Sequence, residues 1–381
     1  MAENSAQHRS SIRDIKERRK VKKHWKKVIV FFLLLAAMLA GLSLVFHHRW
    51  TGNDDIYSLN MSYKEQPADS IDVLYFGTSE ILNSVFPAAM YEETGITGVN
   101  FGTTHKSAIV TYYQLKYALK YQKPKLVVCD FQSLFSGRLP SRSTEDETLY
   151  MKVFDTMPDW DIRLELLHAM KKEDPSVNVA SYLVPVLRYH SMWNELTTKD
   201  FLPDEASRAD YKAYMMGCDL VFNTKYKDER RPDITSIVPE LWTPTGLKEE
   251  LSKISTKYYD KFIALCREEN IPVVALITPK VRDASIKMDR WEQIEGYLSE
   301  RNVDIIDYNT YEEISRLGIR LPEDYKDSAH LNYKGALIVS KDLAHRLSED
   351  YGLEDHRGQQ GFEAWDTYWD EFLKDCETEV K

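Results

Sequence analysis

Short β-rich runs alternate with longer helical patterns over most of this chain, and this alternation constrains the fold most strongly. The β-rich runs have the near-continuous apolar character of strands buried on both faces. They are residues 71–76, 125–130, 272–277 and 303–307. The intervening runs place apolar residues at helical spacing, which predicts crossover helices. We therefore expect an α/β fold with a doubly wound parallel sheet, a three-layer sandwich over residues 71–350.

Two segments depart from this alternation. Residues 141–246 are rich in polar, charged and Pro-containing stretches, with helical patterns at residues 159–172 and 183–196. We interpret them as a helical insertion that covers the functional site. Residues 351–381 form an acidic, aromatic C-terminal tail, in which the aromatic residues recur at helical spacing. That spacing indicates packing against the fold more than a ligand site.

An uncharged and mostly apolar run at residues 28–46 is just long enough to cross a bilayer core of about 30 Å at about 1.5 Å per residue. It exceeds the roughly 7–15 residues of a signal-peptide core, which favours one transmembrane helix over a cleaved signal. Residues 1–27 carry ten Lys and Arg against three Asp and Glu, a charge of +7. The positive-inside rule then predicts that this arm is cytoplasmic and that the domain after the helix is extracytoplasmic, on the cell membrane. We interpret residues 47–70, between the helix and this domain, as a stalk.

The charge of the chain is distributed unevenly. The formal net charge is −10, so the residues after the basic arm carry −17. An acidic domain argues against nucleic acid or anionic lipid as its main partner. The four cysteines are scattered without a paired motif, which suggests buried apolar residues more than a disulfide framework or a zinc site. No ligand cluster implies a metal or an organic cofactor, and we expect none.

A serine and an Asp/His pair stand at places that a parallel α/β fold brings together. Ser79 follows the first expected strand, and Asp327-Ser-Ala-His330 precedes the last core helix. A serine becomes a nucleophile when a base takes its proton and a carboxylate holds that base in one tautomer. Ser79, His330 and Asp327 could fill these three roles. The alternative is structural: Ser79 as a helix cap, Asp327 as a turn residue and Asn332 as an N-cap.

Three blocks of the sequence resemble the SGNH/GDSL hydrolase superfamily, in particular its membrane-anchored extracytoplasmic branch, which includes the D-alanyl-lipoteichoic acid transfer protein and alginate-acetylation proteins. The blocks are Phe76-Gly-Thr-Ser79, Val99-Asn-Phe-Gly102 with the helix that follows it, and Asp327-x-x-His330-Leu-Asn-x-x-Gly335. The resemblance covers roughly residues 70–348, and the insertion matches poorly. It implies Ser79 as nucleophile, His330 as base and Asp327 as its orienting partner.

The chain departs from the pattern of this superfamily at two positions. Glu80 stands where relatives often have a histidine, and the oxyanion-hole asparagine after the third strand has no clear match. We expect the hole to use the amides of Ser79 and Gly102, with the side chain of Gln132 in place of that asparagine. The candidates for substrate contact are Glu80, Asn100, Tyr189 and His190. For the last two, a packed helix face is the alternative.

These features predict an SGNH-type esterase or O-acyltransferase that acts on acyl esters of a cell-envelope polymer, such as a glycan or a teichoic-acid-like chain. An outward-facing domain has no access to cytoplasmic thioesters, so a transferase would need an acyl donor carried across the membrane. The resemblance implies a membrane-bound O-acyltransferase as that partner. The alternative function is a non-catalytic glycan-binding or assembly protein that accompanies such an acyltransferase. In a weaker alternative Asp327 and His330 are metal ligands, although no third ligand lies near them in the sequence.

Overall fold

The computed structural model describes residues 2–46, 54–189, 193–194, 196–201, 211–222, 225–226, 236–281 and 284–379. The chain divides into two compact units. We call Met1–Trp50 with Asn178–Ser207 the anchor unit, and Thr51–Val177 with Arg208–Lys381 the sheet unit. His190, one of the residues predicted to contact substrate, lies outside the described residues.

The described residues of the sheet unit form a five-stranded sheet in the order β2-β1-β3-β4-β5, with every neighbouring pair parallel. The expected doubly wound α/β fold is confirmed. The strands are β1 (Val73–Phe76), β2 (Gly98–Asn100), β3 (Leu126–Cys129), β4 (Val273–Ile277) and β5 (Asp304–Asp307). Four of them lie inside the predicted runs. β2 was not predicted as a strand, because three residues are too few to show a periodic pattern.

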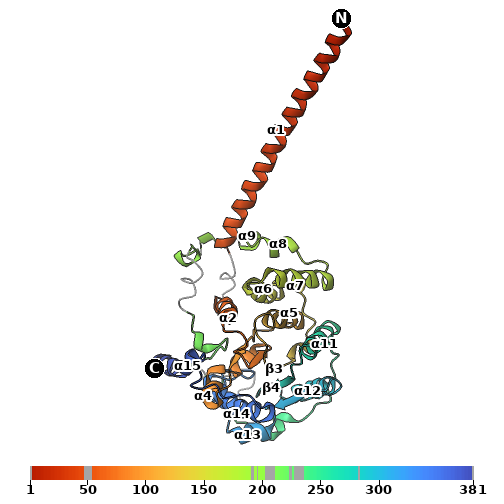
Figure 1. Ribbon diagram of the computed structural model, residues 1–381. Helices are drawn as coiled ribbons and strands as arrows, with labels where there is room; N and C mark the ends of the chain where they lie inside the picture. The colour runs from red at the N-terminus through yellow and green to blue at the C-terminus, as the bar shows by residue number, and fades with distance from the viewer. Residues whose placement is uncertain are drawn as a thin grey trace. The chain divides into compact units, whose positions relative to one another are not determined.

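Helices cover both faces of this sheet. α5 and α11 pack together on one face, and α4 packs against α14 on the other (Figure 1), as right-handed crossovers require when the strand order reverses. The α-helices of the unit are α2 (Asp54–Glu65), α3 (Ser79–Ser84), α4 (Pro87–Thr94), α5 (Ala108–Ala118), α6 (Thr144–Thr156), α7 (Trp160–Glu173), α11 (Lys253–Glu268), α12 (Ala284–Ser299), α13 (Tyr311–Leu317), α14 (Tyr333–Tyr351) and α15 (Glu363–Glu379). The 3₁₀ helices are η2 (Gln132–Phe135), η3 (Pro140–Arg142), η6 (Ala213–Met215) and η7 (Pro239–Trp242).

The segment predicted as a polar stalk contains α2, which belongs to the packed fold. Leu59 and Tyr63 of this helix are buried, and the Tyr63 hydroxyl donates to the carbonyl oxygen of Ala118 at 2.8 Å. The prediction of a stalk is therefore wrong for residues 54–65. The sequence did not indicate that this segment is packed, because α2 is mostly polar and its partner α5 lies far along the chain.

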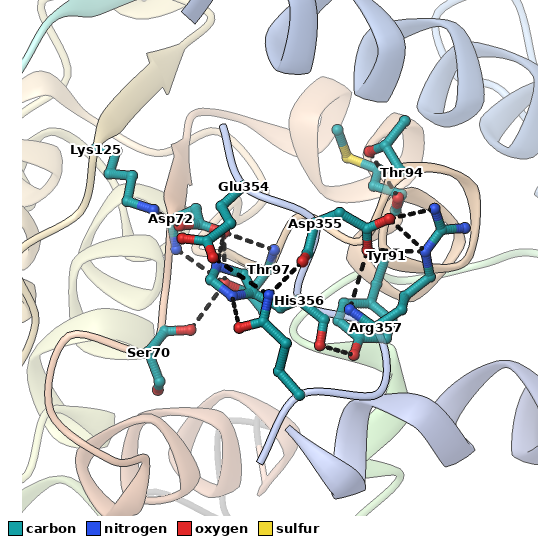
Figure 2. Close-up of polar contacts among 12 residues, drawn as sticks. Ser70, Asp72, Tyr91, Thr94, Thr97, Lys125, Glu354, Asp355, His356 and Arg357 are labelled. Carbon is teal, nitrogen blue, oxygen red and sulfur yellow. Dashed lines mark hydrogen bonds and ion pairs between the residues drawn. The ribbon is translucent and has the colours of Figure 1, made fainter. Parts of the chain in front are cut away.

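The C-terminal tail also folds back onto the sheet unit. In α15, the Phe372 ring lies 4.9 Å from that of Phe86. Before this helix, His356 Nε2 lies 3.0 Å from Asp72 Oδ2 at the start of β1 (Figure 2). The same carboxylate pairs with Lys125 at 3.0 Å and accepts from the Thr97 amide at 3.1 Å. Asp72 thus holds the tail to the amino end of the sheet.

We expect Asp72→Ala to lower the free energy of unfolding by about 3 kcal/mol, because it leaves His356 and the Thr97 amide buried without their acceptor. Urea denaturation followed by circular dichroism measures this. The control is Asp370→Ala, at an exposed position of α15, which should change stability by less than about 0.5 kcal/mol. Equal effects of the two variants would contradict the role of Asp72.

The anchor unit consists of α1 (Ala2–Val45), α8 (Val179–Leu183), α9 (Val186–Tyr189) and η5 (Thr198–Phe201). The predicted basic arm and apolar run form one continuous helix. Its part Lys22–Val45 is long and apolar enough to cross a membrane, and it contains an 18-residue window with a mean hydropathy of 2.9. The helix expected at residues 183–196 is confirmed in part, because α9 lies inside this range. It does not begin at residue 183: α8 ends at Leu183, since Pro185 lacks an amide proton and disfavours helical geometry in the residue before it. Residues 190–192 and 195 of this range lie outside the described residues.

Candidate active site

The structure brings Ser79, His330 and Asp327 together. Ser79 Oγ lies 2.8 Å from His330 Nε2. On the other side of the imidazole, Nδ1 lies 2.9 Å from each carboxylate oxygen of Asp327. The imidazole therefore bridges a hydroxyl and a carboxylate, which is the arrangement that a serine needs to lose its proton.

A tight turn between β1 and α3 presents Ser79. Gly77 precedes it with φ 157°, and a side chain there would meet Asp130 Oδ2 at 2.5 Å. Asp130 Oδ2 accepts from both the amide and the hydroxyl of Thr78, at 2.7 and 2.8 Å. Thr78 is the N-cap of α3 and Ser79 is its first residue. The capping role considered for Ser79 thus falls to its neighbour, and its own hydroxyl contacts His330.

The loop that carries the other two residues is held from both ends. Asp327 Oδ1 also accepts from the amides of Ala329 and His330, at 2.8 and 3.1 Å, which closes a turn around the carboxylate. Asn332 caps α14, as expected, by accepting from the Lys334 amide at 2.9 Å. The His330 side chain is 22% exposed and that of Asp327 is 41% exposed, so a substrate could reach the triad.

The carboxylate of Asp327 is held in its charged form. Burial by itself raises the pKa of Asp327, but the hydrogen bonds from the His330 side chain and the Ala329 amide outweigh it, and the net pKa is lowered. A carboxyl whose pKa is depressed in the folded protein stabilises the fold above its unfolded pKa, near 3.9, and loses this contribution as the pH falls through the folded value.

We therefore expect the stability difference between the wild type and Asp327→Asn to persist from about pH 8 down to about pH 5, and to shrink below about pH 4. Urea unfolding of both proteins across this range measures it. A difference that declines already above pH 5 would show that Asp327 titrates higher than its contacts indicate.

The predicted oxyanion donors differ in whether they already have a hydrogen-bond acceptor. The Gly102 amide donates to Asn100 Oδ1 at 2.8 Å, and Gln132 Nε2 donates to a carboxylate oxygen of Glu80. Within the described part of the chain, the Ser79 amide has no acceptor. Gly102 and Gln132 would therefore have to exchange their present acceptors before they could bind an oxyanion.

Two other predicted residues have structural roles. Asn100 is fully buried, and its amide donates to the carbonyl oxygens of Ile81 and Val85 at 2.9 and 2.7 Å. The prediction that it contacts substrate is wrong, because its polar atoms tie β2 to α3. In the anchor unit Tyr189 is 6% exposed and packs with Phe46, so the packed helix face is the correct interpretation of this residue.

Glu80 forms an ion pair that sequence reasoning missed. Its carboxylate contacts the ammonium of Lys280, whose side chain is fully buried. The ammonium also lies 4.6 Å from the centre of the Trp291 ring. Lys280 comes just after the carboxyl end of β4, where side chains of a parallel sheet converge on Ser79. This position in the sequence could have indicated that Lys280 lies near the site, but it does not identify the residue with which the lysine pairs.

A second buried lysine lies in the loop after β2. Lys106 Nζ donates to the Phe101 carbonyl oxygen at 2.7 Å and to the side chain of Gln114. Burial lowers the pKa of Lys106 to about 7. It contacts this loop, α5 and the Phe76 ring of β1, so it supports the segment that carries Gly102.

A cavity of about 430 Å³ adjoins this segment. Leu82, Gly102 and Thr103 line it, together with residues of α2 and of the stretch 211–219. Thr103 connects it to the nucleophile turn, because its amide donates to the Gly77 carbonyl oxygen at 3.1 Å. Ser79 and His330 do not line the cavity themselves.

The described residues contain no group of three or more His, Cys, Asp or Glu side chains that could hold a metal ion. Asp327 and His330 contact each other and Ser79, which argues against their role as metal ligands. The cysteines are unpaired, and three of them, Cys129, Cys218 and Cys266, are buried, as their scattered placement in the sequence suggested, whereas Cys376 is partly exposed.

No family model matches the chain, and no curated protein matches it. Among solved structures, the chain is similar to a candidate acylhydrolase from Bacteroides fragilis. The two share 11% sequence identity with a TM-score of 0.36, over 76% of this chain and 94% of that one. A likeness this remote carries no functional weight, so the function must be inferred from the contacts of Ser79, His330 and Asp327 themselves.

Proposed function

We propose that this chain is a membrane-anchored serine esterase or O-acyltransferase of the SGNH type, acting on acyl esters of a cell-envelope polymer. One observation carries the proposal: His330 lies between Ser79 Oγ at 2.8 Å and the Asp327 carboxylate at 2.9 Å. The residue types, the distances and the exposure of the site all suit nucleophilic catalysis by serine.

In this mechanism His330 Nε2 takes the Ser79 proton as Oγ attacks the ester carbonyl carbon. The tetrahedral intermediate collapses, the alcohol leaves with the proton returned by His330, and the acyl group stays on Ser79 as an ester. Water or a sugar hydroxyl then attacks this ester, giving its proton to His330, and the Ser79 hydroxyl is restored. Asp327 keeps the Nδ1 proton in place and stabilises the imidazolium in both halves.

The state of the oxyanion donors supports slow turnover of free esters. Each donor contributes about 3 kcal/mol to the stabilisation of the transition state. With the Gly102 amide bound to Asn100 and the Gln132 side chain bound to Glu80, the amide of Ser79 is the one predicted donor ready to act. A domain in this state would hydrolyse free esters slowly and would gain activity when a bound polymer or partner releases the other donors.

Membrane anchoring by α1 supports an immobile or membrane-linked substrate, because a tether confines the domain near it. We place the basic arm, residues 1–27, in the cytoplasm and the sheet unit outside, with a membrane-bound O-acyltransferase as the acyl donor. Protease added to spheroplasts should then cleave the sheet unit and leave an epitope at the N terminus protected. Equal protection of both ends would refute this orientation.

The test of the reaction uses the full chain in detergent with a fluorophosphonate probe, which phosphonylates activated serines. Mass spectrometry of the labelled peptide should locate the probe on Ser79, and small acetyl esters should turn over slowly. If the wild type never labels and still binds the polymer, the non-catalytic glycan-binding role takes its place. The engaged Gly102 and Gln132 donors are the observation that favours this second candidate.

A further inference from the structure

The anchor unit contains an apolar cluster that joins α1 to a segment far along the chain. Phe46, Val186 and Tyr189 form its buried centre. Leu39, Leu42 and Val45 of α1 pack against this centre, as do Val184 and Leu196. Two elements of this segment, α9 and η5, therefore contact α1, and α9 lies at its C-terminal end (Figure 1).

The residues of α1 that this segment packs against determine how deep the segment lies in the membrane. Leu39 lies about two helical turns before Phe46, roughly 10 Å along the helix axis. Leu39 and Leu42 both belong to Lys22–Val45, the part of α1 that can cross a membrane. If that part spans the bilayer, whatever packs beside Leu39 and Leu42 reaches the level of the headgroups and the first acyl carbons.

Large apolar side chains of the same segment are exposed. Leu183 is 40% exposed, Leu187 51%, Trp193 57% and Phe201 64%. Single exposed apolar residues are ordinary on protein surfaces. These four differ because they occur within one short segment that is fastened to a membrane-spanning helix. In addition, the Trp193 ring centre lies 4.6 Å from that of Phe46, the last described residue of α1's apolar run, and tryptophan is enriched at this level of membranes.

We propose that residues 179–189, 193–194 and 196–201 form a membrane-contact segment that inserts Leu183, Leu187, Trp193 and Phe201 into the outer boundary of the bilayer beside α1. The ligand is the zone where lipid headgroups meet acyl chains, which monotopic elements enter to about 5–10 Å. The inference rests on the proposed membrane anchoring and adds a second contact to it. Apolar burial supplies the interaction, so it does not require anionic lipid.

The exposure of the side chains along α1 favours lipid over another protein as the partner of these apolar residues. The described side chains of α1 at residues 29–34 are more than half exposed, as lipid-facing residues of a lone membrane helix would be. In the contact segment, the exposed Trp193 packs against Phe46 at the end of the same apolar run. The consequence is that the anchor unit is held at a fixed height on the membrane.

Site-specific fluorescence quenching in vesicles tests this inference. In a Cys376→Ser background, bimane is attached to Leu187→Cys, and the full chain is reconstituted into phosphatidylcholine vesicles. The remaining native cysteines are buried, and unsubstituted Cys376→Ser protein measures their residual labelling. Leu164→Cys in α7 is the matched aqueous control, since Leu164 is 50% exposed, and Leu34→Cys in α1, at 66% exposure, is the lipid control.

We expect brominated phosphatidylcholine to lower the emission of Leu187→Cys and Leu34→Cys about twofold, and iodide to quench only Leu164→Cys. The inference is overturned if Leu187→Cys responds to iodide as Leu164→Cys does while Leu34→Cys is still quenched by lipid, a result that leaves the anchor intact. Shielding of Leu187→Cys from both quenchers would mean that protein covers the segment, which also overturns it. Failure of lipid to quench Leu34→Cys would remove the membrane anchor itself, and the inference with it.

Discussion

Ser79→Ala is expected to abolish fluorophosphonate labelling and to lower ester turnover by about 10⁴- to 10⁶-fold, because no other group can form the acyl ester. Thermal stability should stay nearly unchanged, since Ser79 is partly exposed and Thr78 caps α3. Labelling and turnover of small acetyl esters measure the first effect, and thermal unfolding measures the second. Ser299→Ala, at an exposed serine on α12, is the matched control.

The triad should act as one unit. His330→Ala is expected to lose about as much activity as Ser79→Ala, and the double variant little more than either, because each change removes the same reaction path. Additive losses would mean that His330 and Ser79 contribute separately, and the hydrogen bond between them would then not be the catalytic one. Full complementation of a gene deletion by Ser79→Ala would establish a binding role.

Lys280→Met is expected to have a large effect on stability, as Ser79→Ala has on activity: it should lower the free energy of unfolding by about 3–5 kcal/mol. The Lys280 side chain is fully buried, so the substitution leaves the Glu80 carboxylate, which is only 13% exposed, without its cation. A charge buried without a partner costs far more than the net contribution of the pair. Urea denaturation of the full chain measures the change.

A second variant separates this ion-pair effect from simple loss of packing. Adding Glu80→Gln to Lys280→Met removes the stranded charge and should restore more than about half of the lost stability. The surface pair of Lys341 and Glu93, at 3.0 Å with side chains 44% and 28% exposed, supplies the control. Lys341→Met should cost less than about 1 kcal/mol. If Glu80→Gln gives no rescue, the role of Lys280 lies in its packing against Trp291.

Some parts of the site followed from the sequence because they depend on local order along the chain. Ser79 comes directly after a buried strand, and Asp327 is separated from His330 by a turn that the Asp327 side chain itself closes. Strand ends of a parallel sheet meet at one edge, so the two places had to approach each other once the fold class was known. The cap at Asn332 is equally local.

Other features could not be predicted, because they depend on partners distant in sequence. Whether the Gly102 amide is free depends on the rotamer of Asn100, and whether Glu80 is a substrate contact depends on a lysine 200 positions later. A mostly polar segment such as α2 looks like a stalk until α5 is placed beside it. These outcomes arise from side-chain packing in three dimensions, which periodicity along the chain does not encode.

By itself, then, the sequence determined the α/β fold class, the apolar stretch of α1 and the approach of Ser79 to Asp327 and His330, since each depends on periodicity or on chain order. The tertiary structure alone decided which polar groups are already bound. The engaged Gly102 amide and the buried pair of Glu80 with Lys280 are of this kind. The physical reason is that a buried polar group must find a partner wherever the fold provides one, and the nearest partner in space is seldom the nearest in sequence.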